Sequence, residues 1–155
     1  MKQLLILSGK GGTGKTTIAS AFIRLARAEV FADCDVDAPN LHLVTNWDAE
    51  PEVEPYYGLA KAQIRKDICV NCGSCAYHCQ FHAVEKKQGK YQINPFACEG
   101  CGVCGYVCPA EAITMQEALA GEMQLYRQDG RVFSTAQLRM GSGNSGKLVT
   151  QVKKK

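Results

Sequence analysis

The sequence lacks a long hydrophobic run and a secretory signal. Its first residues, MKQLLILSG, carry one lysine and a short apolar run at residues 4–7, and no cleavage site follows. No apolar run approaches the roughly 20 residues that a membrane-spanning helix needs. We therefore expect no membrane span and a cytoplasmic location, where nine cysteines indicate metal binding rather than disulfides.

The sequence also lacks the pattern of a nucleic-acid-binding protein. The formal net charge is +3. The basic residues at the C-terminus, Lys153 to Lys155, have no aromatic or arginine-rich patch beside them. We expect this tail to be a solvated helix end, and nucleic acid is not expected as a partner.

Eight of the nine cysteines form two copies of one pattern, C-x2-C-x2-C-x3-C. Cys98 follows Cys69 by 29 residues, and the later cysteines of the second copy keep the same offset from those of the first. Gly73 and Gly102 are also related in this way. We expect the repeat, residues 60–116, to fold as one small α+β domain.

The cysteine spacing is typical of 4Fe-4S cluster ligands. Three closely spaced thiolates can surround one corner of a cluster, and the fourth cysteine of each run is expected to ligate the other cluster. Structural zinc and disulfides are the alternatives, but zinc usually takes four ligands in two separated pairs. The predicted ligands are Cys69, Cys72, Cys75 and Cys108 for cluster 1, and Cys98, Cys101, Cys104 and Cys79 for cluster 2.

This block resembles bacterial two-cluster ferredoxins over nearly its whole length. One departure is that the second run ends in Cys108-Pro109, whereas the first ends in Cys79-Gln80. Because proline has no amide hydrogen, Gln80 leaves one more donor near a sulfur, which bears on the potential of cluster 2 and not on its ligation. The nearby residues His78 and His82 are expected to be surface side chains.

Residues 9–16 match the phosphate-binding loop G-x-x-x-x-G-K-S/T, between a predicted strand at 3–7 and a predicted helix at 16–27. The helix points its positive end at the anion. Lys15 is expected to bridge the β- and γ-phosphates, and the Thr16 hydroxyl to bind Mg²⁺. The predicted ligands of MgATP or ADP are Gly9, Gly11, Gly12, Thr13, Gly14, Lys15, Thr16 and Thr17.

The loop KGGTGKTT resembles the deviant Walker A signature of the MinD/ParA/Mrp superfamily of ATPases, to which the nitrogenase iron protein is related. The resemblance implies a homodimer in which Lys10 reaches the phosphate bound by the other subunit and, with Lys15, acts in catalysis. A lysine supplied across an interface would neutralise charge on the γ-phosphate. A solvated lysine at the edge of the loop is the alternative.

The segment FADCDVDAPNLHL, residues 31–43, resembles switch I of the same superfamily. The resemblance implies that Asp33 supports the magnesium shell and that Asp35 orients the attacking water. Asp37 has no counterpart and is expected only to cap a turn. Cys34, outside both cysteine runs, is expected to be a small buried filler on the strand.

The hydrophobic pattern predicts further elements around these motifs. A strand at 29–33 is expected to lie parallel to the strand at 3–7 in a right-handed βαβ unit. The helix between them is expected to bury Ile18, Phe22, Leu25 and Ala26.

Later in the chain, residues 47–58 are expected to be a linker. A hairpin is expected to turn at Asp129-Gly130. The loop GSGNSG, residues 141–146, should lead into a last helix capped by Asn144 or Ser145. This loop and Lys147 also match most of a second Walker A motif, but Leu148 stands where the magnesium-binding hydroxyl would be.

The sequence therefore predicts an α/β P-loop NTPase fold with an incomplete parallel sheet and an inserted two-cluster ferredoxin-like domain. Residues 1–59 and 117–155 are assigned to the ATPase part, and residues 60–116 to the insertion. The superfamily's Walker B region, a hydrophobic strand followed by Asp-x-x-Pro-Gly, is absent. The resemblance thus covers about the first half of that family's domain, and we expect the chain to be a fragment.

These features predict an ATP-binding iron–sulfur protein. In its full-length form it would be an ATPase whose nucleotide state gates electron transfer through two 4Fe-4S clusters to an unidentified redox partner. One alternative is an Mrp-like carrier or assembly ATPase for iron–sulfur clusters, although eight ligands in two complete sites argue against labile clusters. Another is a plain ferredoxin-type electron carrier with a non-hydrolysing nucleotide site.

Overall fold

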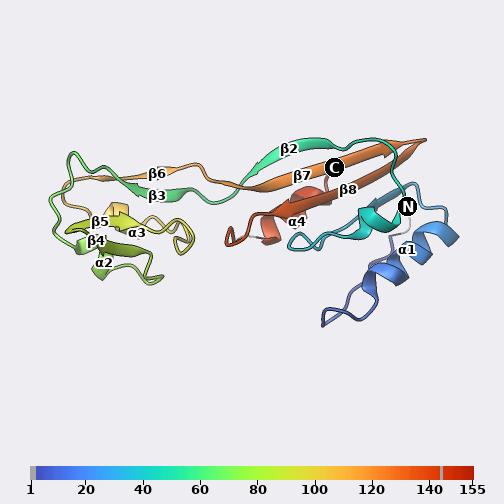
Figure 1. Cartoon of the computed structure of the whole chain (residues 1–155), viewed down its shortest axis with the longest axis horizontal. Coiled ribbons are helices and arrows are strands. Elements are labelled where there is room, and N and C mark those ends of the chain that lie inside the picture. Colours follow the sequence, from blue (N-terminus) through green and yellow to red (C-terminus); the bar gives the residue numbers. More distant parts are fainter. Residues whose placement is uncertain (1–2, 144) are drawn as a thin grey trace. The chain divides into compact units, whose positions relative to one another are not determined.

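The computed structural model describes residues 3–143 and 145–155 (Figure 1). The chain divides into two compact units, and each is described on its own. The first contains the chain up to Pro55, Glu122–Leu138 and the residues from Ser145 onward. The second contains Tyr56–Gly121 and the short segment that begins at Arg139.

A four-stranded sheet organises the first unit, in the order β1-β8-β7-β2. Its strands are β1 (Val30–Ala32), β2 (Glu52–Tyr57), β7 (Leu119–Gln128) and β8 (Arg131–Leu138). Its helices are α1 (Lys15–Leu25), the 3₁₀ helix η1 (Leu41–Val44) and α4 (Ser145–Val152). β1 runs parallel to β8, with Phe31 opposite Phe133.

The sheet is mixed, because β7 and β8 are joined by a two-residue turn and so run antiparallel. The turn residues Asp129 and Gly130 both have positive φ, 50° and 76°. This conformation suits the right-handed twist of the two strands and favours Asp-Gly. The predicted hairpin is therefore confirmed, and the sheet, expected to be an incomplete parallel one, is mixed.

The predicted strand at residues 3–7 does not form. Leu4, Leu5 and Leu7 are largely exposed. The expected pairing of this segment with residues 29–33 is also wrong: among the described residues β1 pairs with β8 and lies at the edge of its sheet. An apolar run becomes a strand only where a neighbouring strand takes up its backbone hydrogen bonds, and no strand in the described part of the chain pairs with residues 3–7.

Two further expectations in the first unit are corrected. Residues 47–58 are not simply a linker, since β2 forms within them. In α1 the expected apolar face is wrong: Ile18 and Phe22 are about half exposed and Leu25 is 83% exposed. Ala19 and Ile23 pack against the core instead, so the buried stripe is rotated around the helix.

The core of the first unit is aromatic. Leu41, Tyr126 and Phe133 are buried together, and Phe31 and Trp47 pack against them. The Phe133 ring centroid lies 5.1 Å from that of Phe31 and 5.8 Å from that of Trp47. On α4, which packs against β8, Leu148 and Val152 lie four residues apart and are fully buried. These contacts fix the segment that follows β1.

The two cysteine runs fold as related halves of the second unit. β3 (Lys61–Ile64) pairs antiparallel with β6 (Ile113–Gln116), and β4 (Val84–Lys87) pairs antiparallel with β5 (Lys90–Ile93). The short helices are α2 (Ser74–Tyr77) and α3 (Val103–Tyr106). The 29-residue offset of the sequence relates β3 to β5, β4 to β6 and α2 to α3.

Hydrogen bonds of the backbone repeat in the same way. The Asn94 amide donates to the Ala83 carbonyl and the Arg65 amide donates to the Ala112 carbonyl, both at 2.7 Å. Both alanines are almost fully buried. The two halves therefore share one backbone geometry, so that differences between them are differences of side chains.

Candidate functional site

The eight repeated cysteines line two hollows in the second unit. The structure thus brings together each set of four that the spacing assigns, with the fourth cysteine of each run facing the other run's hollow. The first hollow is lined by Cys69, Cys72, Cys75 and Cys108, and the second by Cys79, Cys98, Cys101 and Cys104.

Glycine is required where each cysteine loop enters its short helix. Gly73 and Gly102 have φ of 81° and 78°, a left-handed conformation that strains any residue with a Cβ. At Gly73 a Cβ would also lie 2.7 Å from the Tyr91 hydroxyl. Both glycines line their hollows, so they also let the backbone approach the space between the sulfurs closely.

Two backbone amides donate to cysteine sulfurs. The Ala83 amide donates to Cys79 Sγ and the Ala112 amide donates to Cys108 Sγ, both at 3.3 Å. These are the fourth cysteines of the two runs, so each hollow receives one such bond. The additional donor that Gln80 was expected to supply is not among the hydrogen bonds to sulfur within the described residues.

The chemistry of the cysteine sets fits a polynuclear metal group. All nine cysteines are free thiols in the structure. Burial raises the pKa of the Cys75 thiol, and its neighbours, Cys104 first among them, raise it further. Burial likewise raises the pKa of the Cys104 thiol. Bound metal would supply positive charge that stabilises several thiolates in one place.

The number and kind of the ligand side chains bear on which metal group fits. Among the described residues, no three His, Cys, Asp or Glu side chains are placed to hold a single metal ion. Four cysteines line each of the two hollows, and four cysteines are the ligand set of a 4Fe-4S cluster. The residues present therefore fit a 4Fe-4S cluster.

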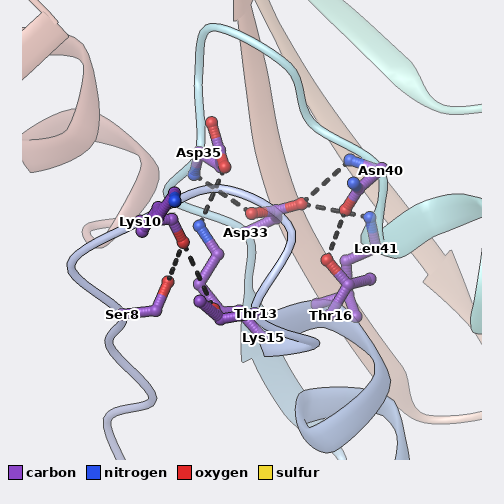
Figure 2. A network of polar contacts seen from close by, with 9 residues as sticks. All are labelled: Ser8, Lys10, Thr13, Lys15, Thr16, Asp33, Asp35, Asn40 and Leu41. Atoms are coloured by element: carbon purple, nitrogen blue, oxygen red, sulfur yellow. Dashed lines mark hydrogen bonds and ion pairs between the residues drawn. The ribbon is translucent and has the colours of Figure 1, made fainter.

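The glycine-rich loop leads directly into α1 in the first unit (Figure 2). Gly12 and Gly14 have φ of 74° and 83°, so the chain turns twice through the left-handed region before the helix begins at Lys15. The Lys10 carbonyl accepts hydrogen bonds from the Ser8 and Thr13 hydroxyls, at 3.1 and 3.2 Å. These bonds hold the loop in a closed curve.

Lys15 and Asp35 form an ion pair at the mouth of this loop. Lys15 Nζ lies 2.8 Å from Asp35 Oδ2, and each side chain is 36% exposed. The hydrogen bond to Asp35 raises the pKa of Lys15, although burial opposes it. The contact joins the loop to the segment after β1, as Figure 2 shows.

Asp33 is buried and accepts three backbone hydrogen bonds. Its Oδ1 accepts from the Asp35 amide at 3.0 Å, and its Oδ2 accepts from the Asn40 and Leu41 amides at 3.1 Å each. Both carboxylate oxygens are thus engaged in shaping the turn before η1. The magnesium role expected for Asp33 stays a prediction beside this structural one.

Sequence reasoning missed Asn40. Its Oδ1 accepts from the Thr16 hydroxyl at 2.7 Å, so it holds the residue expected to bind Mg²⁺. An asparagine directly before the apolar turn LHL suggests a helix cap, but its side chain makes no cap to η1. The position of Asn40 in the sequence therefore points to the backbone of η1 as its partner, whereas its partner in the structure is the Thr16 hydroxyl.

The remaining predicted residues lie near this network. The Thr17 carbonyl accepts from the Ser20 hydroxyl within α1. Asp37 is exposed. Cys34 follows the end of β1 and is half-buried, so its expected position on the strand is wrong. The capping role of Asn144 lies outside the described residues, and no ion pair within them involves Lys10.

Comparison with known families defines the class of the second unit. Residues 62–115 match the model of the 4Fe-4S dicluster domain family. The chain therefore contains an iron–sulfur, ferredoxin-like domain. The match leaves the glycine-rich loop at 9–16 outside it.

One relative extends the comparison beyond this domain. The chain is 38% identical over 85 residues to the uncharacterized protein MJ0578 of Methanocaldococcus jannaschii. The aligned part covers 53% of this chain but spans only 30% of the relative's length. Within the described residues, no helix is both long enough and apolar enough to cross a membrane.

Proposed function

We propose that this protein carries electrons through two 4Fe-4S clusters. Cluster 1 is held by Cys69, Cys72, Cys75 and Cys108, and cluster 2 by Cys79, Cys98, Cys101 and Cys104. The observation that supports this most directly is the convergence of each set of four on one of two matching hollows. Each bound cluster would supply reversible one-electron chemistry.

The residues around each hollow have defined roles in this proposal. The amides of Ala83 and Ala112 stabilise negative charge on the sulfurs that they contact, which favours the reduced state. Ile64 and Ile93 line the first and second hollow respectively. Their side chains keep water from the sulfurs, and a drier site makes added negative charge harder to accept.

Crossed ligation has a direct test in cysteine protection. In the anaerobically reconstituted wild type we expect about eight irons per chain and only Cys34 open to alkylation. Replacing Cys108 by Ser should halve the iron content and expose the cysteines of the first run, Cys69, Cys72 and Cys75, in peptide mapping.

The control for this test is Cys34→Ser, which should keep both sets protected. If Cys108→Ser instead exposed Cys98, Cys101 and Cys104, ligation would not be crossed. Far fewer than about eight irons in the wild type, or zinc in their place, would contradict the two-cluster proposal itself.

We further propose that the loop at residues 9–16 binds MgATP or ADP. Gly9 and Gly11 support this, because neither has a positive φ and a Cβ at either would meet no atom within 4 Å. The fold alone does not require glycine at these two positions. Close approach of phosphate to the backbone would require it.

The ion pair of Lys15 with Asp35 suits the same role. A bound phosphate would take the place of the carboxylate beside Lys15, leaving Asp35 near the γ-phosphate, where it could orient a water. Thr16 would bind Mg²⁺, and Asp33 would support the ligands around the metal. Lys10 of a second copy would complete the site in a homodimer, as the superfamily resemblance implies.

In this proposal nucleotide state gates electron transfer in the full-length protein. Two comparisons test it. Lys15→Ala should weaken binding of a fluorescent ATP analogue at least about tenfold, the effect of losing one charged contact, while Lys147→Ala, in the second glycine-rich segment, should not. MgATP should also shift the cluster potential of the full-length protein; an unchanged potential with both ATP and ADP would contradict gating.

A cluster carrier is the second candidate function. It is favoured by the exposure of Cys72 and Cys101, one cysteine in each set. Removal of the clusters by a chelator within minutes, with gain of clusters by an apo-ferredoxin in the same mixture, would support the carrier over the electron-transfer proposal.

A further inference from the structure

Among the corresponding positions that line both hollows, two differ in polarity. Because the halves share one backbone geometry, each residue that lines the first hollow can be compared with the residue 29 positions away. Tyr91 lines the first hollow where Ala62 lines the second. Val70 lines the first where Glu99 lines the second.

Tyr91 presents its hydroxyl to the loop that carries Cys72. A Cβ on Gly73, the residue after this cysteine, would lie 2.7 Å from the Tyr91 hydroxyl oxygen. A Cβ on the corresponding Gly102 would meet nothing within 4 Å. The first hollow therefore has a phenol donor at its wall, and the second has none at the matching position.

A positive charge lies over the same tyrosine. Lys86 is the cross-strand partner of Tyr91 in the β4–β5 pair, and its Nζ is 5.4 Å from the centroid of the ring. The matching cross-strand pair in β3–β6 is Met115 with Ala62, which carries neither charge nor hydroxyl. A cation over the ring polarises the phenol and makes it a stronger donor.

The second hollow carries a carboxylate beside its ligands. Glu99 follows Cys98 directly and lines this hollow, and its negative charge opposes addition of an electron nearby. Lys61 partly offsets it, because its ammonium donates to the Cys98 carbonyl. Near the first hollow Asp67 is paired with Arg65 at 3.2 Å, so that carboxylate is offset as well.

We propose that Tyr91 and Glu99 make the two cluster sites unequal, so that a single added electron settles at the site of Cys69, Cys72, Cys75 and Cys108. This rests on the proposed two-cluster function. Tyr91 donates a hydrogen bond toward the sulfurs at that site and stabilises the extra charge, while Glu99 repels it at the other. Moving the electron between sites oxidises one by one electron, reduces the other by one electron, and breaks no bond.

The test is an anaerobic redox titration of the reconstituted protein, followed by electron paramagnetic resonance. We expect two one-electron steps in the wild type. Their midpoints should differ by about a tenfold change in equilibrium constant, which is about 59 mV, since a hydrogen bond to a charged acceptor has an effect of that order. Tyr91→Phe should lower the higher midpoint and leave the lower one in place.

Two further variants complete the test. Glu99→Gln should raise the lower midpoint only. Tyr77→Phe is the matched control, because Tyr77 lies in the same half but is 86% exposed and does not line the hollow; it should move neither midpoint.

The outcomes that overturn this inference are distinct from those that overturn the two-cluster proposal. A fully loaded protein that titrates in one step, or in which Tyr91→Phe moves the lower midpoint or none, overturns the inference alone. A wild type that binds far fewer than about eight irons overturns the two-cluster proposal, and the inference with it.

Discussion

The substitution Asp33→Asn distinguishes two roles of this side chain, one in holding the turn before η1 and one in supporting bound magnesium. Replacing it by Asn exchanges one carboxylate oxygen for an NH₂ group, which cannot accept a hydrogen bond. With the amide oxygen in the Oδ2 position, the bonds from Asn40 and Leu41 survive and the bond from Asp35 is lost. The reverse orientation loses two bonds. Since Asp33 is only 9% exposed, the new NH₂ group at this position would itself be a buried donor facing another donor.

The loss of stability expected for Asp33→Asn follows from this count of hydrogen bonds. One buried donor left without a partner costs about 1–3 kcal/mol, so Asp33→Asn should lower the free energy of unfolding of the first unit by that amount. Urea unfolding followed through the fluorescence of Trp47, the one tryptophan, measures this quantity. Asp37→Asn, an exposed neighbour, should change it by less than about 0.5 kcal/mol.

The result that would refute this reasoning is an Asp33→Asn protein as stable as the wild type. If such a protein also lost affinity for MgATP, the carboxylate would act on the metal and not on the turn. If stability fell and the affinity at low urea stayed unchanged, Asp33 would be structural only.

Three other predictions use similar contrasts. Phe133→Ala should destabilise the first unit by about 3–5 kcal/mol, because Phe133 is completely buried. Leu25→Ala, at an exposed position, should change the stability measured by Trp47 fluorescence little. Equal losses of stability for the two variants would contradict the assigned core. Burial raises the pKa of Cys34, so less of its thiolate is present at a given pH. Alkylation of Cys34 by iodoacetamide in the reconstituted protein should therefore be slower than alkylation of free cysteine, and it should accelerate at higher pH. A rate equal to that of free cysteine at pH 7 would argue against burial of this thiol. Gly89→Ala, in open space at φ 77°, should lower the free energy of unfolding by about 1–2 kcal/mol. Gly100→Ala, whose Cβ would clash with the Ala60 carbonyl oxygen, should lower it more and should also weaken iron retention. Equal losses of stability for the two variants, in urea unfolding followed by iron–sulfur absorbance, would contradict this clash.

What could be predicted from the sequence depended on local chemistry. The hairpin was predictable because Asp129 and Gly130 can both adopt positive φ, whatever the rest of the chain does. The grouping of the cysteines was also local. Three ligands within seven residues, such as Cys69 to Cys75, can reach only a common centre, and the identical spacing of the second run implies a matched site.

What could not be predicted depended on distant partners. Residues 3–7 have the composition of a buried strand, but composition does not say whether a strand lies beside them, and none of the described strands pairs with them. The face of α1 was misassigned for the same reason, because its buried side is decided by Leu41 and Phe133, which come later in the chain. Asn40 was missed because its partner Thr16 lies 24 residues earlier.

The repeat supplies an internal control that most single chains lack. Where the two halves agree, as in the Ala83 and Ala112 amides that contact sulfur at the same distance, the shared feature is required to build either site. Where the two halves differ in sequence, their shared backbone geometry is not the cause of a difference between the two cluster sites. The side chains must then account for any difference in cluster potential. Gln80 and Pro109 illustrate this: they differ in having an amide hydrogen, yet the sulfur bond at each turn comes from the alanine four residues after the cysteine. Any inequality of the two sites would therefore come from side chains around the hollows, such as Tyr91 of the first hollow, which stands where Ala62 lines the second.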